Sequence, residues 1–256
     1  MKITVIGGGN MGGAIARGLA KGNTVATASI TVTDPYKEVL ERLKAEYPAI
    51  HTTTENHAAI EEADIIILAV KPWLVKQVLS SIKITNRQVL VSVAAGINFE
   101  ELIESTSPEI TIFRLIPNTA ITHLESMNLI ASYNASKEQE ELLLTIFNEM
   151  GLSMLIPESW MEATTALTSC GIAFVLKYIQ AAMQAGVEMG VPPQAAMKMV
   201  AQSVKGAAEL ILNSDTHPSV EIDKVTTPGG VTIKGVNELE HNGFSSAIIK
   251  AMKVSR

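Results

Sequence analysis

The sequence predicts an α/β protein in two parts, an N-terminal doubly wound domain over residues 1–157 and an all-helical C-terminal domain over residues 158–256. Two observations predict the first part. The chain opens with a β-branched run, a glycine-rich turn and helical apolar spacing, and strand-like runs then alternate with helical stretches. The third observation is a change to long runs of helix formers near residue 160, which predicts the second part.

The glycine-rich turn is typical of dinucleotide binding. Residues 2–6 form a short strand, residues 7–12 read Gly-Gly-Gly-Asn-Met-Gly, and apolar residues at helical spacing follow. Gly7 permits the tight turn, Gly9 lets the backbone approach a pyrophosphate, and Gly12 lets the helix pack closely on the strand. We therefore expect a Rossmann domain in which Gly7, Gly9, Asn10, Met11 and Gly12 bind the cofactor.

The second strand, over residues 29–33, ends in Asp34, about twenty residues beyond the last glycine of the turn. An acid at this position commonly accepts hydrogen bonds from the adenosine ribose diol, which favours NADH. Asp34-Pro35 equally suits the start of the next helix, because Asp is a good N-cap. Lys37 can also neutralise a 2′-phosphate, so both NADPH and NADH remain candidates.

The alternating pattern continues and predicts a parallel sheet. Further strands are expected at 49–52, 65–70, 89–93, 110–115 and 152–156, with helices that include 36–47 and 73–82. Ligands of such sheets bind beyond the carboxyl ends of the strands. Three strand exits are therefore candidate cofactor contacts, namely 69–72, 94–96 and 117–119.

Composition excludes several classes of function. The formal net charge is −6 and the basic residues are scattered, so nothing indicates nucleic-acid binding. The N-terminus runs straight into glycines without a signal-peptide core, and we find no apolar run long and uncharged enough to cross a membrane, so we expect a cytoplasmic protein. Cys170 is the one cysteine, which excludes an intramolecular disulfide and a structural zinc site. We interpret it as a small buried apolar residue, and expect no metal.

The helical part carries more apolar surface than it can cover. Residues 163–189 are apolar on more than one side, and Pro192-Pro193 starts another helix that reaches about Leu212. A helix that is apolar all round must be buried, yet a piece of about a hundred residues has little interior. A second subunit is the favoured solution, and packing against the chain's own sheet is the alternative.

We expect a loop between the helix that ends near Leu212 and the final helix, and this loop carries residues 215–218 and then residues 224–232, which read Lys-Val-Thr-Thr-Pro-Gly-Gly-Val-Thr. Proline, two glycines and flanking hydroxyls form a turn whose backbone N–H groups and small donors suit a carboxylate. Combined with a nicotinamide site, this turn indicates a reductase that acts on a small acid.

These motifs resemble the pyrroline-5-carboxylate reductase family. That family shows G-x-G-N-M-G, A-V-K-P, S-x-x-A-G-[IV], R-x-M-P-N and V-[ST]-[ST]-P-G-G-x-T in this order, and the corresponding segments here are 7–12, 69–72, 92–97, 114–118 and 225–232. The resemblance covers nearly the whole chain. It implies reduction of 1-pyrroline-5-carboxylate to L-proline, the last step of proline biosynthesis, by a homodimer that can assemble into a larger ring of dimers.

The resemblance also assigns roles to residues. It implies that Asn56 approaches the adenosine ribose, and that Ala95 and Pro117 lie near the nicotinamide. The other residues expected along the cofactor are Ala69, Val70, Lys71, Pro72 and Gly96.

The substrate roles come from the same source. The resemblance implies that Thr227, Gly230 and Val231 bind the substrate carboxylate, with Gly229 in the same turn. Thr232 would face the ring nitrogen as the catalytic residue, and Asp215 matches an acid near that nitrogen.

The chain departs from the family pattern in one helix. Residues 168–174 read Thr-Ser-Cys-Gly-Ile-Ala-Phe where the family usually has S-G-S-G-P-A-[YF], a change that bears on efficiency and on the preferred imino acid. Smaller departures are Ile116, Ala120 and the pair Glu221-Ile222.

Two other functions remain as alternatives. A 3-hydroxyacid-dehydrogenase-like oxidoreductase would need a helical Lys such as Lys177, but the Asn residues expected beside it are missing, so we interpret Lys177 as a surface side chain. A dinucleotide-binding protein without catalysis is supported only by the altered segment 168–174. We interpret His217 as a cap or loop residue.

Overall fold

The computed structural model describes residues 1–214 and 216–256. Contacts within the chain divide it into two compact units, Met1–Ser169 and Cys170–Arg256. Residues 158–169, which the sequence assigns to the helical domain, belong to the first unit by their contacts. The boundary at 157/158 remains a prediction about functional domains.

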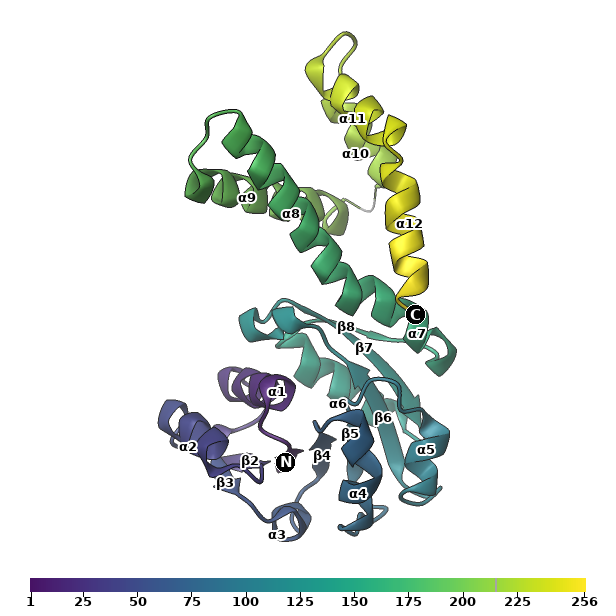
Figure 1. The fold of residues 1–256 in the computed structure, drawn as a ribbon. Coiled ribbons are helices and arrows are strands. Elements are labelled where there is room, and N and C mark those ends of the chain that lie inside the picture. The colour runs from purple at the N-terminus through teal and green to yellow at the C-terminus, as the bar shows by residue number, and fades with distance from the viewer. Residues whose placement is uncertain (215) are drawn as a thin grey trace. The chain divides into compact units, whose positions relative to one another are not determined.

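The first unit contains one eight-stranded sheet in the order β3-β2-β1-β4-β5-β6-β7-β8 (Figure 1). Its strands are β1 (Ile3–Ile6), β2 (Ile30–Thr33), β3 (His51–Thr53), β4 (Ile65–Leu68), β5 (Val89–Ser92), β6 (Thr111–Ile116), β7 (Ser126–Tyr133) and β8 (Gly151–Leu155). Neighbouring strands from β1 to β6 pair in parallel. The predicted doubly wound Rossmann sheet is therefore confirmed over this part.

The far side of the sheet differs from a purely parallel one, because β7 runs antiparallel to β6. Only a short 3₁₀ segment, Thr119–His123, lies in the connection between them. A parallel neighbour would need a crossover of a dozen residues or more. β8 then pairs with β7 in parallel, after the crossover helix α6 (Lys137–Asn148).

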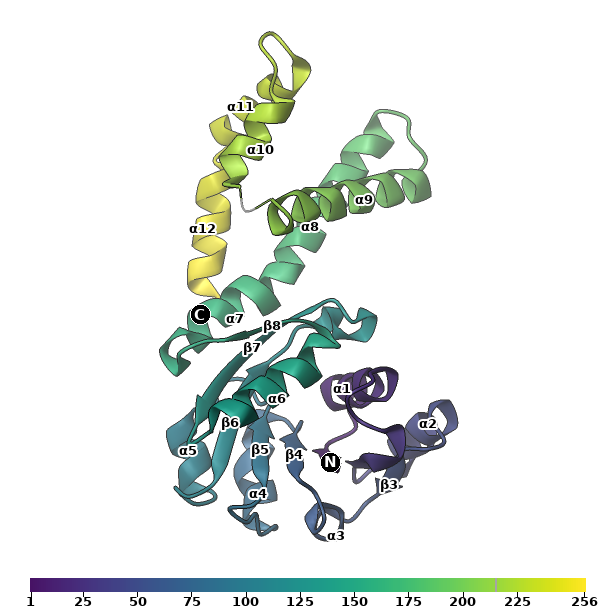
Figure 2. The ribbon, with the colours of Figure 1, turned by 180° about the vertical axis from the view of Figure 1, so that it is seen from behind.

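Two apolar clusters lie on the two faces of the sheet. The first cluster joins the sheet to α1 (Asn10–Lys21), α2 (Lys37–Glu46) and α6. The second joins it to α3 (Asn56–Ile60), α4 (Val75–Ser80), α5 (Phe99–Glu104) and α7 (Met161–Thr165). Figure 2 shows α6 beside β6 and β7 from behind. Burial on both faces explains why the central strands are continuous apolar runs.

Local sequence signals account for several helix starts in this unit. Asn98 and Glu101 form a reciprocal capping box at α5, and Ser136 and Gln139 form another at α6. Short 3₁₀ turns at Pro72–Leu74 and Glu158–Trp160 precede α4 and α7. The two capping boxes mark where the chain enters α5 after β5 and α6 after β7.

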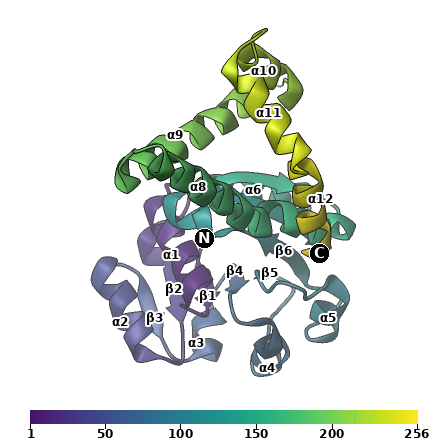
Figure 3. The same cartoon turned by 45° about the horizontal axis from the view of Figure 1, so that its top comes forward.

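The second unit is helical, as the sequence predicts. Its helices are α8 (Gly171–Glu188), α9 (Pro193–Leu212), α10 (Pro218–Val225), α11 (Val231–His241) and α12 (Phe244–Val254). α8 and α9 lie side by side (Figure 3). A π-helical turn, Ala166–Cys170, leads into α8. The predicted end of α9 at Leu212 agrees with the structure.

Two expectations about this half were wrong. The stretch between α9 and α11 is not simply a loop, because Pro218 at the first helical position starts α10, and Val231 and Thr232 belong to α11. The helical run 158–188 is also long and apolar enough to cross a membrane by length and composition, although we expected no such run. That criterion alone is weak, since core helices of soluble proteins also meet it.

Candidate functional site

The glycine turn has the geometry that close packing requires. Gly7 has φ +99°, a conformation that side-chain-bearing residues rarely adopt, and a Cβ there would collide with the carbonyl oxygen of Ala69. A Cβ on Gly12 would overlap the carbonyl oxygen of Gly7 and crowd Ala69. The structure therefore brings the start of α1 against the exit of β4. A Cβ at Gly9 would meet nothing within 4 Å, so the backbone of Gly9 is open to a ligand that approaches from outside.

Asp34 is held by the same turn. Its carboxylate oxygens accept hydrogen bonds from the backbone N–H groups of Gly8 at 2.8 Å and Tyr36 at 2.9 Å, and the residue is only 8% exposed. Tyr36, rather than Asp34, is the N-cap residue of α2. Asp34 thus joins the glycine turn to the entrance of α2, a structural role that leaves the ribose interpretation as a prediction.

A hollow beside the glycine turn carries positive charge. Gly8, Gly9 and Asn10 line it together with Arg17 and Lys21 of α1 and Arg42 of α2. Arg17 is bonded to Glu46 at 2.6 Å. Cations near Asp34 bear on the choice of cofactor, because they favour a 2′-phosphate that the Asp34 carboxylate disfavours.

The remaining expected cofactor residues lie at the carboxyl edge of the sheet. Asn56 is the first residue of α3, and its Oδ1 accepts a hydrogen bond from Thr33 Oγ1 at 2.5 Å. Met11 is partly buried against the core near the turn. The strand exits hold Ala69, Val70, Lys71 and Pro72 after β4, Ala95 and Gly96 after β5, and Pro117 after β6. Ala95 and Gly96 are exposed there, whereas Pro117 is buried.

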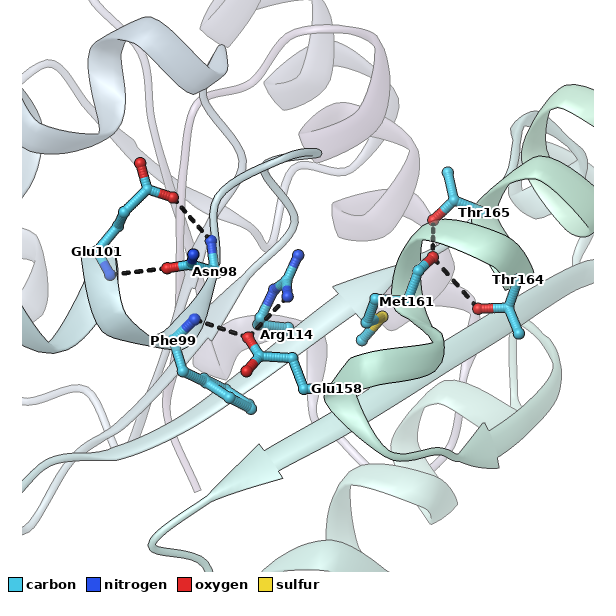
Figure 4. Close-up of polar contacts among 8 residues, drawn as sticks. All are labelled: Asn98, Phe99, Glu101, Arg114, Glu158, Met161, Thr164 and Thr165. Carbon is cyan, nitrogen blue, oxygen red and sulfur yellow. Dashed lines mark hydrogen bonds and ion pairs between the residues drawn. The ribbon is translucent and has the colours of Figure 1, made fainter. Parts of the chain in front are cut away.

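A partly buried ion pair near these strand exits is a feature that the sequence does not predict. Arg114 of β6 is 7% exposed, and its Nη1 donates to Glu158 Oε1 at 2.7 Å (Figure 4). The same oxygen accepts the backbone N–H of Phe99, at the start of α5. A charged residue inside an otherwise apolar strand was the available signal, since a buried arginine requires an anionic partner.

Asn118 lies in the predicted β6 exit at 117–119, but its contacts are not predicted by the sequence. Its Nδ2 donates to the backbone oxygen of Thr168 at 3.1 Å, and its Oδ1 accepts from Ala120 N at 3.0 Å. Ser169 Oγ donates to the carbonyl oxygen of Pro117 at 3.3 Å. The altered segment therefore begins in contact with the exit of β6.

The second unit contains the expected substrate turn. Gly230 N donates to the carbonyl oxygen of Thr227 at 2.9 Å, and Gly229 has φ +74°. With Pro228 at its second position, this is a type II turn, whose third position requires glycine. A Cβ on Gly230 would lie 2.7 Å from Thr227 Oγ1 and 3.0 Å from the Thr227 carbonyl oxygen, so a larger residue there would crowd the turn.

The turn ends at a helix N-terminus. Gly230 is the N-cap of α11, and Val231 and Thr232 are its first two helical residues. Their backbone N–H groups have no partner within the helix, and the helix dipole favours an anion at this end. Val231 is 83% exposed. This arrangement has the donors that a carboxylate needs, as the sequence predicts.

The segment before the turn holds a short polar chain. Thr216 Oγ1 donates to Glu221 Oε1 at 2.5 Å, and Lys224 Nζ donates to the same oxygen at 2.7 Å. The Lys224 ammonium and then the Thr216 hydroxyl hold the pKa of the Glu221 carboxyl below its usual range. Asp215, the expected acid near the substrate nitrogen, lies outside the described residues.

Other single residues have structural roles. His217 is the N-cap of α10, with its Nδ1 accepting from Ser219 N at 3.2 Å, so the cap interpretation is confirmed. Lys177 Nζ donates to Gln180 Oε1 at 2.9 Å on the helix surface. Cys170, at the end of the π-helical turn, is only partly buried, contrary to our expectation. In the part of the chain that the structure describes, no His, Cys, Asp and Glu side chains form a metal-binding group.

The fold and these turns define a class: a Rossmann-type dinucleotide-binding unit followed by a helical unit with a Pro-Gly-Gly turn at a helix N-terminus. Family models divide the chain in a similar way. Residues 2–96 match the model for "NADP oxidoreductase coenzyme F420-dependent", and residues 158–256 match "Pyrroline-5-carboxylate reductase dimerisation".

Known proteins identify the family. Pyrroline-5-carboxylate reductase 1 of Dictyostelium discoideum is 39% identical over 99% of this chain, which spans 48% of that longer relative. The Methanosarcina acetivorans reductase is 36% identical over 100% of this chain and 97% of its own length. A crystal structure of Plasmodium falciparum pyrroline carboxylate reductase with NADP bound has a TM-score of 0.89 and 29% identity, covering 100% of this chain and 95% of that one. The chain belongs to the pyrroline-5-carboxylate reductase family.

Proposed function

We propose that this chain reduces 1-pyrroline-5-carboxylate to L-proline with NADPH or NADH. The type II turn at residues 227–230, which delivers Val231 and Thr232 to a helix N-terminus, is the observation that supports it most directly. It supplies anion donors and a hydroxyl within a few residues, in a chain whose other unit has the dinucleotide fold. Family membership supports the same substrate.

The residues of the first unit fit the cofactor. Gly9 leaves space for a pyrophosphate beside the N-terminus of α1, and the β4, β5 and β6 exits lie along the edge where dinucleotides bind. When bound, the reduced nicotinamide supplies a hydride to the carbon of the C=N bond. The glycine turn, Asn56 and the strand exits bind and orient it, as we predict from the resemblance.

The substrate turn supplies orientation and charge. In our proposal, the Thr227 hydroxyl and the N–H groups of Gly230 and Val231 bind the carboxylate. The Thr232 hydroxyl hydrogen-bonds the ring nitrogen, whose charge and geometry change during reduction. A protonated imine is already electrophilic, so placement accounts for most of the demand on the protein. The acid role that the resemblance implies for Asp215 stays a prediction.

We also propose a cytoplasmic homodimer. The family model that matches residues 158–256 describes dimerisation, and the helices of the second unit expose many large apolar side chains. A ring of such dimers is a further proposal, supported by the resemblance alone. Mass photometry at nanomolar concentration would separate a dimer from a larger ring.

One assay matrix tests the activity. Purified protein is mixed with pyrroline-5-carboxylate, a second cyclic imino acid or a 3-hydroxyacid, each with both cofactors. We expect NAD(P)H oxidation with the imino acids and no reduction of NAD(P)⁺ with the hydroxyacid. Turnover of the hydroxyacid alone would favour the dehydrogenase alternative. Cofactor binding without any turnover would favour a non-catalytic protein.

A further inference from the structure

Arg114 and Glu158 lie close to the β5 and β6 exits, which the proposed function assigns to the nicotinamide. Arg114 is on β6 between Ile112 and Ile116, and both neighbours belong to the apolar cluster on that sheet face. Glu158 starts the 3₁₀ turn before α7. Figure 4 shows their side chains directed toward one another, with the backbone nitrogen of Phe99 beside them.

One carboxylate oxygen joins three separate segments. Glu158 Oε1 accepts from Arg114 Nη1 and from Phe99 N, each at 2.7 Å. Arg114 precedes Pro117 by three residues, and Phe99 follows the Ala95-Gly96 exit by three. Both predicted nicotinamide-lining loops are therefore tied to a single side chain that lies outside them.

The third segment is the helical run that begins at Glu158. It contacts the β6 exit again farther along, where Asn118 Nδ2 bonds the Thr168 backbone oxygen and Ser169 Oγ bonds the Pro117 carbonyl. Between the two contacts lie α7 and the start of the π-helical turn at Ala166. Single π-helical turns often occur at functional sites. Residues 158–169 are thus attached to strand β6 at one end, through Arg114, and to the β6 exit at the other end.

A buried arginine costs more free energy in a core position than an aliphatic side chain does, even with a partly exposed partner such as Glu158. Arg114 Nε is buried without a hydrogen-bond partner among the described residues. An aliphatic side chain between Ile112 and Ile116 would complete the apolar face without this cost, because a buried charge loses its hydration. An aliphatic residue could not, however, hold Glu158 at the start of α5.

We propose that Glu158, held by Arg114, is a positioning residue for hydride transfer. It fixes the β5 and β6 exit loops relative to one another, so that the nicotinamide ring has one orientation between them. This inference rests on the proposed function. Neither side chain is assigned contact with substrate or cofactor, and both act through the loops.

The test compares Glu158→Gln with Glu162→Gln in the full chain. The glutamine side chain of the first variant can still accept the Phe99 N–H but no longer neutralises Arg114, whereas Glu162 is exposed on α7 and serves as the matched control. We expect Glu158→Gln to lower kcat about tenfold, equivalent to about 1.4 kcal/mol in the barrier. Deuterium at the transferred position of the cofactor should give a larger isotope effect on kcat than in wild type. Glu162→Gln should match wild type.

Adenosine diphosphate separates positioning from general damage. It occupies only the adenosine side of the cofactor site, so its dissociation constant should stay within twofold in Glu158→Gln. The double variant Glu158→Gln/Arg114→Met, which removes both charges, should lose less activity than the two single changes combined. A folded Glu158→Gln with wild-type kcat and isotope effect would overturn the proposal. A Glu158→Gln variant that loses ADP affinity and melting temperature along with kcat would also overturn the proposal, because the damage would then be general. Absence of imine reduction by wild type would instead reject the proposed function.

Discussion

The two units of this chain solve the problem of burial differently. The first unit contains two apolar clusters built around eight strands, and nearly all the buried apolar residues in the described parts of the chain belong to it. In the second unit, Ala196 is the one buried hydrophobic residue among those described. Helices with large exposed apolar side chains are stable only when another surface covers them. The first unit carries its own core, whereas the second is covered by a partner subunit in the dimer that we propose.

The largest effect should follow from placing a charge on the helical surface. Leu210 of α9 is 52% exposed and lines an apolar hollow with Ile222 and Val225 of α10. In a two-fold dimer, Leu210→Glu would introduce two carboxylates, each costing several kcal/mol if buried. We expect the dimer dissociation constant to rise at least about a thousandfold, since about 1.4 kcal/mol is a factor of ten. Light scattering should show a monomer of 27.4 kDa, with activity lost.

The matched control is Leu142→Glu on α6 of the first unit. Leu142 is also exposed and apolar, but lies on the unit that has its own core. It should leave mass and activity unchanged. A wild type that is already a monomer at micromolar concentration would contradict the proposed coverage of the second unit by a partner subunit. A fully active dimer of Leu210→Glu would contradict it as well.

The next effect concerns the second unit's proposed catalytic hydroxyl. Thr232→Ala should lower kcat about ten- to a hundredfold, which corresponds to about 1.4 to 2.7 kcal/mol, because the bond to the ring nitrogen strengthens in the transition state. Thr227→Ala should mainly raise the KM for the imino acid. Steady-state kinetics with proline as a competitive inhibitor would separate the two. An unchanged kcat in Thr232→Ala together with a lost kcat in Thr227→Ala would mean that their roles are exchanged.

How far the sequence predicts the molecule also differs between the units. Strand and helix positions of the first unit follow from local patterns, since each element buries its face within the same chain. A strand near Asn128 is predicted by the sequence, but the antiparallel direction of β7 is not, because strand direction depends on the length and path of the β6–β7 connection. In the second unit, α10 was missed because its start depends on Pro218 and the His217 cap, inside a segment that resembles a loop.

Site prediction divides in the same way. The glycine turn and the type II turn are recognisable because their backbone conformations demand particular residues, as at Gly7 and Gly229. The bond from Phe99 and the ion pair of Arg114 to Glu158 link residues far apart in the chain. No local pattern predicts such contacts, although a charge within an apolar strand signals that one exists.

A smaller effect should follow from the conformation of the substrate turn. Gly229→Ala places a Cβ on a residue with φ +74°, at a cost of about 1 to 2 kcal/mol in the bound turn. We expect the KM for the imino acid to rise several-fold, with kcat changed less. Gly235→Ala is the matched control, because Gly235 lies inside α11 and an added Cβ there would meet nothing within 4 Å. Equal effects of the two substitutions would argue against a specific role for the turn.

The smallest effect concerns cofactor choice in the first unit, where a carboxylate and a basic hollow lie near one glycine turn. Asp34→Ser should lower the KM for NADPH relative to NADH by about fivefold, since removing one like charge near the 2′-phosphate relieves about 1 kcal/mol in a hydrated site. The substitution also loses bonds from Gly8 and Tyr36, so the melting temperature should fall. Asp34→Asn keeps one acceptor, so it should have a higher melting temperature than Asp34→Ser and a similar change in cofactor preference.

Arg42→Gln should shift the cofactor preference toward NADH if its side chain reaches the 2′-phosphate from the hollow. The wild type could instead prefer NADPH already, with Asp34 variants that change only the melting temperature. Asp34 would then serve the glycine turn alone, and Arg17, Lys21 and Arg42 would determine the cofactor preference.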